Sequence, residues 1–155
     1  MVEFKQTETK KQSYLYIERT CSLDPADIAA NMGACFAGVQ TFMAEHKVKP
    51  MGAPMAVYPH FDAHSLTFRA GFPVSQKNAK LANGDVGADV LPASNVLTFT
   101  HVGPYYTLRN SYAEMMGYMQ LHGLHMGGAT WESYKTDPET TPEDQNVTVV
   151  STVLA

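Results

Sequence analysis

Six short segments of the chain have the residue pattern of strands, and most of them alternate polar and apolar positions. In the first, residues 12–20, Tyr14 and Tyr16 fall on one face and Leu15 and Ile17 on the other. The other predicted strands are residues 55–60, 64–74 (bent at Gly71), 96–102, 130–135 and 147–154. Turns are expected at residues 50–54, 61–63 and 127–128, and a loop rich in proline and acidic residues at 137–145.

Two longer segments repeat apolar residues at spacings of three and four, which is typical of amphipathic helices. The first begins with Ser22 or Asp24 as its N-cap and ends near His46, and the second runs from residue 105 or 106 to His122. The two predicted stripes are Ile28, Met32, Cys35, Phe36, Val39, Phe42 and Met43, and then Leu108, Tyr112, Met115, Met116 and Met119.

The order strand, helix, strand, strand therefore occurs twice. When the segments after the two helices are aligned, Gly52 falls on Gly128 and Tyr58 on Tyr134. This repeat predicts an α+β fold with pseudo-two-fold symmetry, in which an antiparallel sheet carries both helices on one face. We expect a single domain over residues 1–155, with half one at about 12–74, a polar loop at 75–90 and half two at about 91–154. A central ligand groove between the halves is expected on the face without helices.

Composition narrows the class of protein. The 155 residues are 45% hydrophobic and 17% charged, which favours a folded core over disorder. The net charge of -4 and the lack of a basic run argue against direct nucleic-acid binding. No segment is long and apolar enough to predict a membrane span, and residues 1–12 do not resemble a secretory signal. Two cysteines, Cys21 and Cys35, are expected to be buried in a reducing cytoplasm.

Glu132 is the least expected residue of a predicted strand. In residues 130–135 it shares a face with Tyr134, whereas Trp131 points to the other side. One interpretation is an exposed strand residue; the other is a carboxylate at the floor of an aromatic groove, where it attracts a cation or acts as a general base. Tyr58 matches Tyr134 through the repeat and is expected to face the groove from the opposite side.

The second predicted helix adds two candidates. Tyr112 and Tyr118 are six residues apart and so lie on different faces, which leaves at most one of them to line a site. Met115 belongs to a group of methionines that suits either a core or an adaptable apolar wall. The histidines do not follow a metal-ligand pattern, and phosphate-loop and dinucleotide fingerprints are absent, so neither a metal nor a cofactor is predicted. His101, at a strand end, is a candidate supporting residue.

Several runs resemble those of a known family, the GyrI-like small-molecule-binding domain. They are His101-Val102-Gly103-Pro104-Tyr105 with Leu108, Tyr112, Met115 and Tyr118; Gly123-Leu124, Gly128, Trp131-Glu132-Ser133-Tyr134 and Thr136-Asp137-Pro138; and Gly71-Phe72-Pro73-Val74 with Leu91-Pro92. The family is also known as the effector-binding domain of bacterial multidrug-responsive transcription activators. The resemblance covers about residues 12–154.

The resemblance implies a groove for amphipathic, aromatic or cationic molecules, with Glu132 as the cation partner and Tyr134 in the wall. Two departures are notable: the first half has residues 19–25 in place of a second Gly-Pro-Tyr run, and no DNA-binding segment precedes Gln12. We therefore expect a stand-alone member rather than a whole regulator. Trp131, Tyr112 and Met115 complete the set of expected ligand-binding residues.

Three functions follow from these observations. The first is binding of amphipathic small molecules. The second, also implied by the resemblance, is hydrolysis of reactive cyclopropane-containing compounds by Glu132 with Tyr134 or Tyr58. The third is a protein interaction, either with DNA gyrase or with a separate regulator, for which the acidic residues 137–144 are available. The first two need the same residues, so the sequence does not separate them.

Overall fold

The strands form one antiparallel sheet in the computed structural model, which describes residues 2–59 and 63–155. Within these residues eight strands follow the order β1-β6-β8-β7-β3-β4-β2-β5. Their bounds are β1 Lys5–Glu8, β2 Gln12–Cys21, β3 Met55–Tyr58, β4 Leu66–Pro73, β5 Gly87–Leu91, β6 Asn95–Val102, β7 Met126–Tyr134 and β8 Val147–Leu154. The helical segments are α1 Pro25–Glu45, α2 Gln76–Ala79, η1 Tyr105–Thr107, α3 Leu108–Leu121 and η2 Glu143–Gln145.

The two halves meet in the middle of the sheet, where β3 pairs with β7. On either side the order is the same: β3, β4, β2 in one half and β7, β8, β6 in the other. The outermost strands are exchanged between the halves, because β1 pairs with β6 and β5 pairs with β2. The predicted α+β fold with a duplicated strand–helix–strand–strand unit is therefore confirmed.

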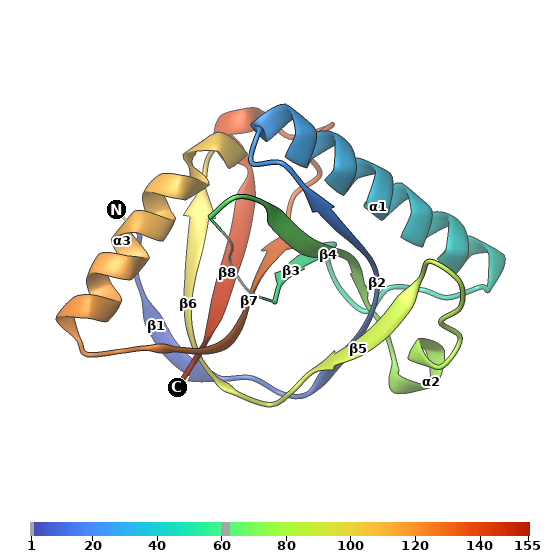
Figure 1. Cartoon of the computed structure of the whole chain (residues 1–155), viewed down its shortest axis with the longest axis horizontal. Coiled ribbons are helices and arrows are strands. Elements are labelled where there is room, and N and C mark those ends of the chain that lie inside the picture. The colour runs from blue at the N-terminus through green and yellow to red at the C-terminus, as the bar shows by residue number, and fades with distance from the viewer. Residues whose placement is uncertain (1, 60–62) are drawn as a thin grey trace.

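Both long helices cover the same face of the sheet, α1 beside β2 and α3 beside β6, and they diverge from each other (Figure 1). Helix α1 begins where predicted: Asp24 accepts a hydrogen bond from the Ala26 backbone N–H (3.0 Å), and Pro25 needs no such partner. Each helix packs on its own half through a separate core. Under α1 the core includes Leu15, Ile17, Cys35, Val39, Met43, Phe68, Ala70 and Phe72; under α3 it includes Leu97, Phe99, Leu108, Met115, Met119 and Val150.

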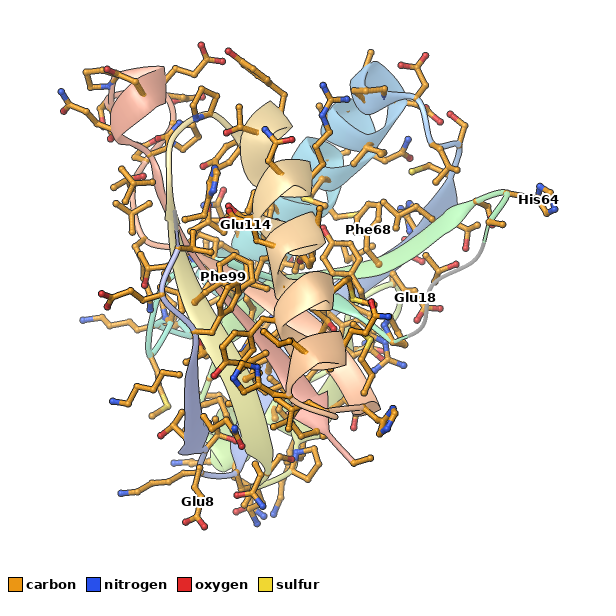
Figure 2. The ribbon with its side chains drawn as sticks, turned by 90° about the vertical axis from the view of Figure 1, so that its left-hand side faces the viewer. Glu8, Glu18, His64, Phe68, Phe99 and Glu114 are labelled. Atoms are coloured by element: carbon orange, nitrogen blue, oxygen red, sulfur yellow. The ribbon has the colours of Figure 1, made fainter. Side chains whose placement is uncertain are left out.

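The side view labels one phenylalanine from each of these two cores. Phe99 and Phe68 lie within the body on the two sides of α3, whereas Glu8 and His64 lie at the periphery (Figure 2). On the opposite face of the sheet a third, smaller cluster contains Tyr14, Met55, Val57 and Leu91, with Trp131 packed against it.

Four details differ from the sequence-based predictions. The expected loop at residues 75–90 contains α2 and all of β5 except Leu91. Strand β1 was not expected, because all its residues are exposed. Gly127 and Gly128 lie inside β7, not in a turn, at a register shift where a side chain on Gly127 would meet the Ala155 backbone. Met116 is 52% exposed instead of packed. The predicted connection at residues 61–63, and the end of the strand at residues 55–60, fall partly on residues 60–62, outside the described residues.

Among residues 2–59 and 63–155, no helix is both long enough and apolar enough to span a membrane.

Candidate functional site

Glu132 lies at the centre of the sheet, on the face that the helices cover. The alternation of β7 directs Thr130, Glu132 and Tyr134 toward the helices. Only 5% of the Glu132 surface is exposed. The structure thus excludes the interpretation of Glu132 as an exposed strand residue. It also shows that our placement of its groove on the helix-free face is wrong, because the side chain points between the helices.

The register of the central strands explains this position. Ala56 of β3 pairs with Glu132, and Tyr58 pairs with Thr130, while the Tyr134 backbone N–H donates to the Pro54 carbonyl (2.9 Å). If Tyr58 and Tyr134 are equivalent residues of the two halves, each lies two residues from the Ala56–Glu132 pair, on opposite sides of it. The pseudo-two-fold axis therefore passes beside Glu132, and Ala56 is its uncharged counterpart.

Three tyrosine hydroxyls converge on the Glu132 carboxylate. The Tyr134 hydroxyl donates to Oε1 at 2.7 Å, and the Tyr58 hydroxyl reaches the same oxygen at 3.4 Å. The Tyr112 hydroxyl, from α3, donates to Oε2 at 2.5 Å. The carboxylate is thus held by residues of β3, β7 and α3, which come from both halves of the chain.

These contacts determine how the site titrates. Burial raises the pKa of Glu132, and the hydrogen bonds from the three tyrosines oppose that shift. Burial and the nearby carboxylate raise the pKa values of Tyr58, Tyr112 and Tyr134, so the phenols remain neutral donors. The two ion pairs found among the described residues both belong to Arg69, so Glu132 takes part in neither.

Aromatic side chains surround the tyrosines. Phe36 of α1 and Tyr105 of η1 both meet the Tyr134 ring edge-on, with ring centroids 6.1 and 5.6 Å away. Phe99 packs in the same way against Tyr112, at 6.0 Å. The sulfur of Met32 lies 3.6 Å from the Tyr134 hydroxyl oxygen. A carboxylate with aromatic side chains packed around its donors is an arrangement that suits an organic cation.

The predicted site residues divide into two groups. Tyr58, Tyr112 and Tyr134 meet at Glu132, and Tyr118 lies elsewhere, against Phe4. Of the other two candidates, one lies on the far face of the sheet and one belongs to the core against which Tyr112 packs. Trp131 packs on the opposite face of the sheet, as its place in the alternation requires, and Met115 is fully buried in the core under α3.

Sequence reasoning did not select Met32, Phe36, Phe99 or Tyr105 for the site. Met32 and Phe36 occupy the predicted stripe of the first helix, and Tyr105 belongs to the Gly-Pro-Tyr run. Each therefore carried a signal, but a core stripe and a site wall have the same pattern. In the part of the chain that the structure describes, no group of three or more His, Cys, Asp or Glu side chains could hold a metal ion.

The fold and this geometry agree with the comparison against known families. The model of the GyrI-like small molecule binding domain matches residues 2–151, so the chain belongs to that family. The comparison with curated protein sequences produced no significant match.

Solved structures extend the likeness at the level of the fold. The C-terminal domain of EcmrR superposes with a TM-score of 0.76 at 17% identity, covering 100% of this chain and 98% of that one. EcmrR in its complex with DNA superposes at 0.83 and 15% identity, covering 99% of this chain, which spans 57% of the length of that protein. SAV2435, whose structure holds tetraphenylphosphonium, superposes at 0.67 and 9% identity, with coverage of 99% and 94%.

Proposed function

We propose that this protein binds amphipathic organic cations in the cytoplasm, with the Glu132 carboxylate as charge partner. The observation that carries the proposal is a buried carboxylate held by three neutral tyrosine donors and included in neither ion pair of the described residues. Desolvation makes such a charge costly, and an entering cation would recover part of that cost. The surrounding rings would bind the apolar surface of the same ligand.

Two further facts support this ligand class. The fold is shared with SAV2435, which binds tetraphenylphosphonium, a cation whose charge is enclosed by four aromatic rings. The rings of Phe36 from α1 and Tyr105 from η1 pack on the ring of Tyr134, whose hydroxyl contacts the carboxylate. A flat or globular aromatic cation could then contact rings and charge together.

The charge role can be tested with Glu132→Gln and two ligands of similar aromatic surface. Tetraphenylphosphonium is cationic and triphenylphosphine oxide is neutral. We expect the substitution to weaken binding of the cation about tenfold or more, and binding of the neutral compound by less than about twofold, in calorimetric titrations. The difference arises because glutamine keeps the shape and loses the charge.

Glu114→Gln is the matched control. Glu114 is exposed on α3, the helix that also carries Tyr112, and its replacement changes the net charge by the same amount. Figure 2 labels it on α3. Equal losses for the cation and the neutral compound in Glu132→Gln, or an equal loss of cation binding in Glu114→Gln, would contradict the proposed charge role.

Hydrolysis of a reactive small molecule is the second candidate. It is favoured by the contact between the Glu132 carboxylate, whose pKa burial raises, and the Tyr134 hydroxyl at 2.7 Å, a base beside a donor. A hydrolase from Listeria innocua shares the fold at a TM-score of 0.63 and 13% identity, with coverage of 99% and 92%. In a strained cyclopropane, water would bond to one ring carbon while Glu132 takes its proton. The ring C–C bond would break, and the released carbon would take a proton from Tyr134.

Mass spectrometry separates hydrolysis from binding. An electrophilic cyclopropane compound incubated with the protein should yield a product heavier by one water molecule, and Glu132→Gln should abolish that product. Stoichiometric binding without product would reject hydrolysis for the compounds tested and would leave the binding proposal in place.

A further inference from the structure

Thr148 is a buried residue whose hydroxyl the fold does not use. It lies on β8, between His101 of β6 and Tyr134 of β7, and is 0% exposed. Among the described residues, Oγ1 of Thr148 is a buried side-chain polar atom without a hydrogen-bond partner. Burying an unpaired hydroxyl is costly, and such a group in a folded protein calls for an explanation.

The neighbouring polar groups do not supply that partner, because they already have partners. The His101 ring bonds through Nδ1 to the Ser111 hydroxyl (2.7 Å) and through Nε2 to the Thr107 hydroxyl (3.0 Å). The Tyr134 hydroxyl is directed to Glu132. Of His101, Tyr134 and Thr148, it is therefore Thr148 whose side chain is left without a hydrogen-bond partner.

A second threonine on the same strand shows the usual solution. Thr152 is also 0% exposed and faces the helices, but its hydroxyl bonds to the Thr130 hydroxyl at 2.7 Å. The two threonines share strand, face and burial and differ in whether the fold provides a partner. Thr148 is also the one beside the site, since it pairs with Tyr134, and the next pair on that face of β7 and β8 is Glu132 with Val150.

The segment formed by η1 and α3 lies over both Thr148 and Glu132. The segment formed by η1 and α3 reaches His101 through Thr107 and Ser111, and it reaches Tyr134 through the Tyr105 ring. Since Thr148 lies between His101 and Tyr134 in the sheet, the same segment spans it. A ligand that gains access to the carboxylate beneath this segment therefore comes within one residue pair of the hydroxyl.

We infer that the Thr148 hydroxyl forms a hydrogen bond with an uncharged polar group of the ligand. The inference rests on the proposed function and makes it more specific: the preferred ligands are amphipathic cations that carry a hydroxyl or carbonyl beside the charged centre. In such a complex Glu132 would pair with the charge, the aromatic rings would contact the apolar part, and Thr148 would hydrogen-bond to the polar group. Thr148 and Glu132 are diagonal neighbours on β8 and β7, and such positions are about 7–8 Å apart, a distance that two groups of one small molecule can span together with the two side chains.

The test uses two probes of equal charge and nearly equal shape, benzyl(2-hydroxyethyl)dimethylammonium and benzyldimethylpropylammonium. Their dissociation constants are measured by calorimetry for the wild type, Thr148→Val and Thr152→Val. The preference for the hydroxyl probe over the propyl probe should fall about fivefold in Thr148→Val, the value of one neutral hydrogen bond, and should be unchanged in Thr152→Val. Urea unfolding should show lower stability for Thr152→Val, which leaves Thr130 unpaired, and no loss for Thr148→Val.

The outcomes separate the two proposals. If the wild type binds both probes and Thr148→Val keeps the same preference, the inference about Thr148 is overturned and cation binding stands. A loss of stability in Thr148→Val equal to that in Thr152→Val would also overturn it, because the hydroxyl would then have a partner inside the protein. If the wild type binds neither probe nor tetraphenylphosphonium, the proposed function itself fails and the inference fails with it.

Discussion

Replacing Tyr112 by phenylalanine removes a single hydroxyl from the site. The ring stays, and with it the edge-on packing against Phe99. The lost bond is the 2.5 Å contact to Glu132 Oε2, whereas Tyr134 and Tyr58 both use Oε1. A hydrogen bond to a charged group contributes about 1.5–3 kcal/mol, and because Tyr112 is half-buried we expect a loss of about 1.5–2 kcal/mol in the free energy of unfolding.

Urea unfolding at a pH above the raised pKa of Glu132, where the carboxyl is ionised, measures this loss. The matched control is Tyr118→Phe on the same helix, whose ring packs on Phe4, with an expected change below about 0.5 kcal/mol. In a Glu132→Gln background the cost of Tyr112→Phe should fall by roughly half, because a neutral acceptor forms the weaker bond. Equal costs for the two tyrosines, or the same cost in both backgrounds, would refute the role given to this hydrogen bond.

Two further predictions concern pH and glycine. Burial raises the pKa of Glu132, so its contribution to stability is present at low pH and is lost as pH rises through that pKa. Relative to Glu132→Gln, the wild type should lose unfolding free energy as pH rises above about 4, the ordinary pKa of a glutamate, while its affinity for tetraphenylphosphonium increases. Parallel stability curves for the two proteins would contradict this. Gly71→Ala should lower the free energy of unfolding by at least about 2 kcal/mol, because a Cβ there would lie 1.8 Å from the Leu15 carbonyl oxygen. Gly33→Ala, on the exposed side of α1 with nothing within 4 Å of the new Cβ, should raise that free energy by about 0.5–1 kcal/mol. Urea midpoints test both, and a Gly71→Ala variant as stable as the wild type would be the contrary result.

Some elements of the fold follow directly from local residue patterns. Asp24 and Pro25 mark the start of α1, and the apolar spacing behind them carries the helix to its observed end. The strand β8 has the predicted bounds Val147–Leu154, because its residues are β-branched or apolar almost throughout. These elements could be predicted because each needs only its own residues to specify it.

The two exchanged strands are of another kind. All four residues of β1, Lys5–Glu8, are exposed, and the first three after Gly87 in β5 are exposed as well. Neither strand buries an apolar face that would produce a regular pattern, and backbone pairing with β6 and β2 holds them in place. Gly127 and Gly128 resemble a turn in sequence, yet they permit the close approach of the end of β8.

The sequence by itself determined which residues could act together: alternation places Glu132 and Tyr134 on one face of a strand and Trp131 on the other, and the internal repeat relates Tyr58 to Tyr134. Only the tertiary structure decided that this face is the one beneath the helices, and that Tyr112 from α3 completes the set of donors. The physical reason is that alternation has two equivalent directions. The choice between them depends on which face of the whole sheet the two helices bury, and that is a property of both halves together.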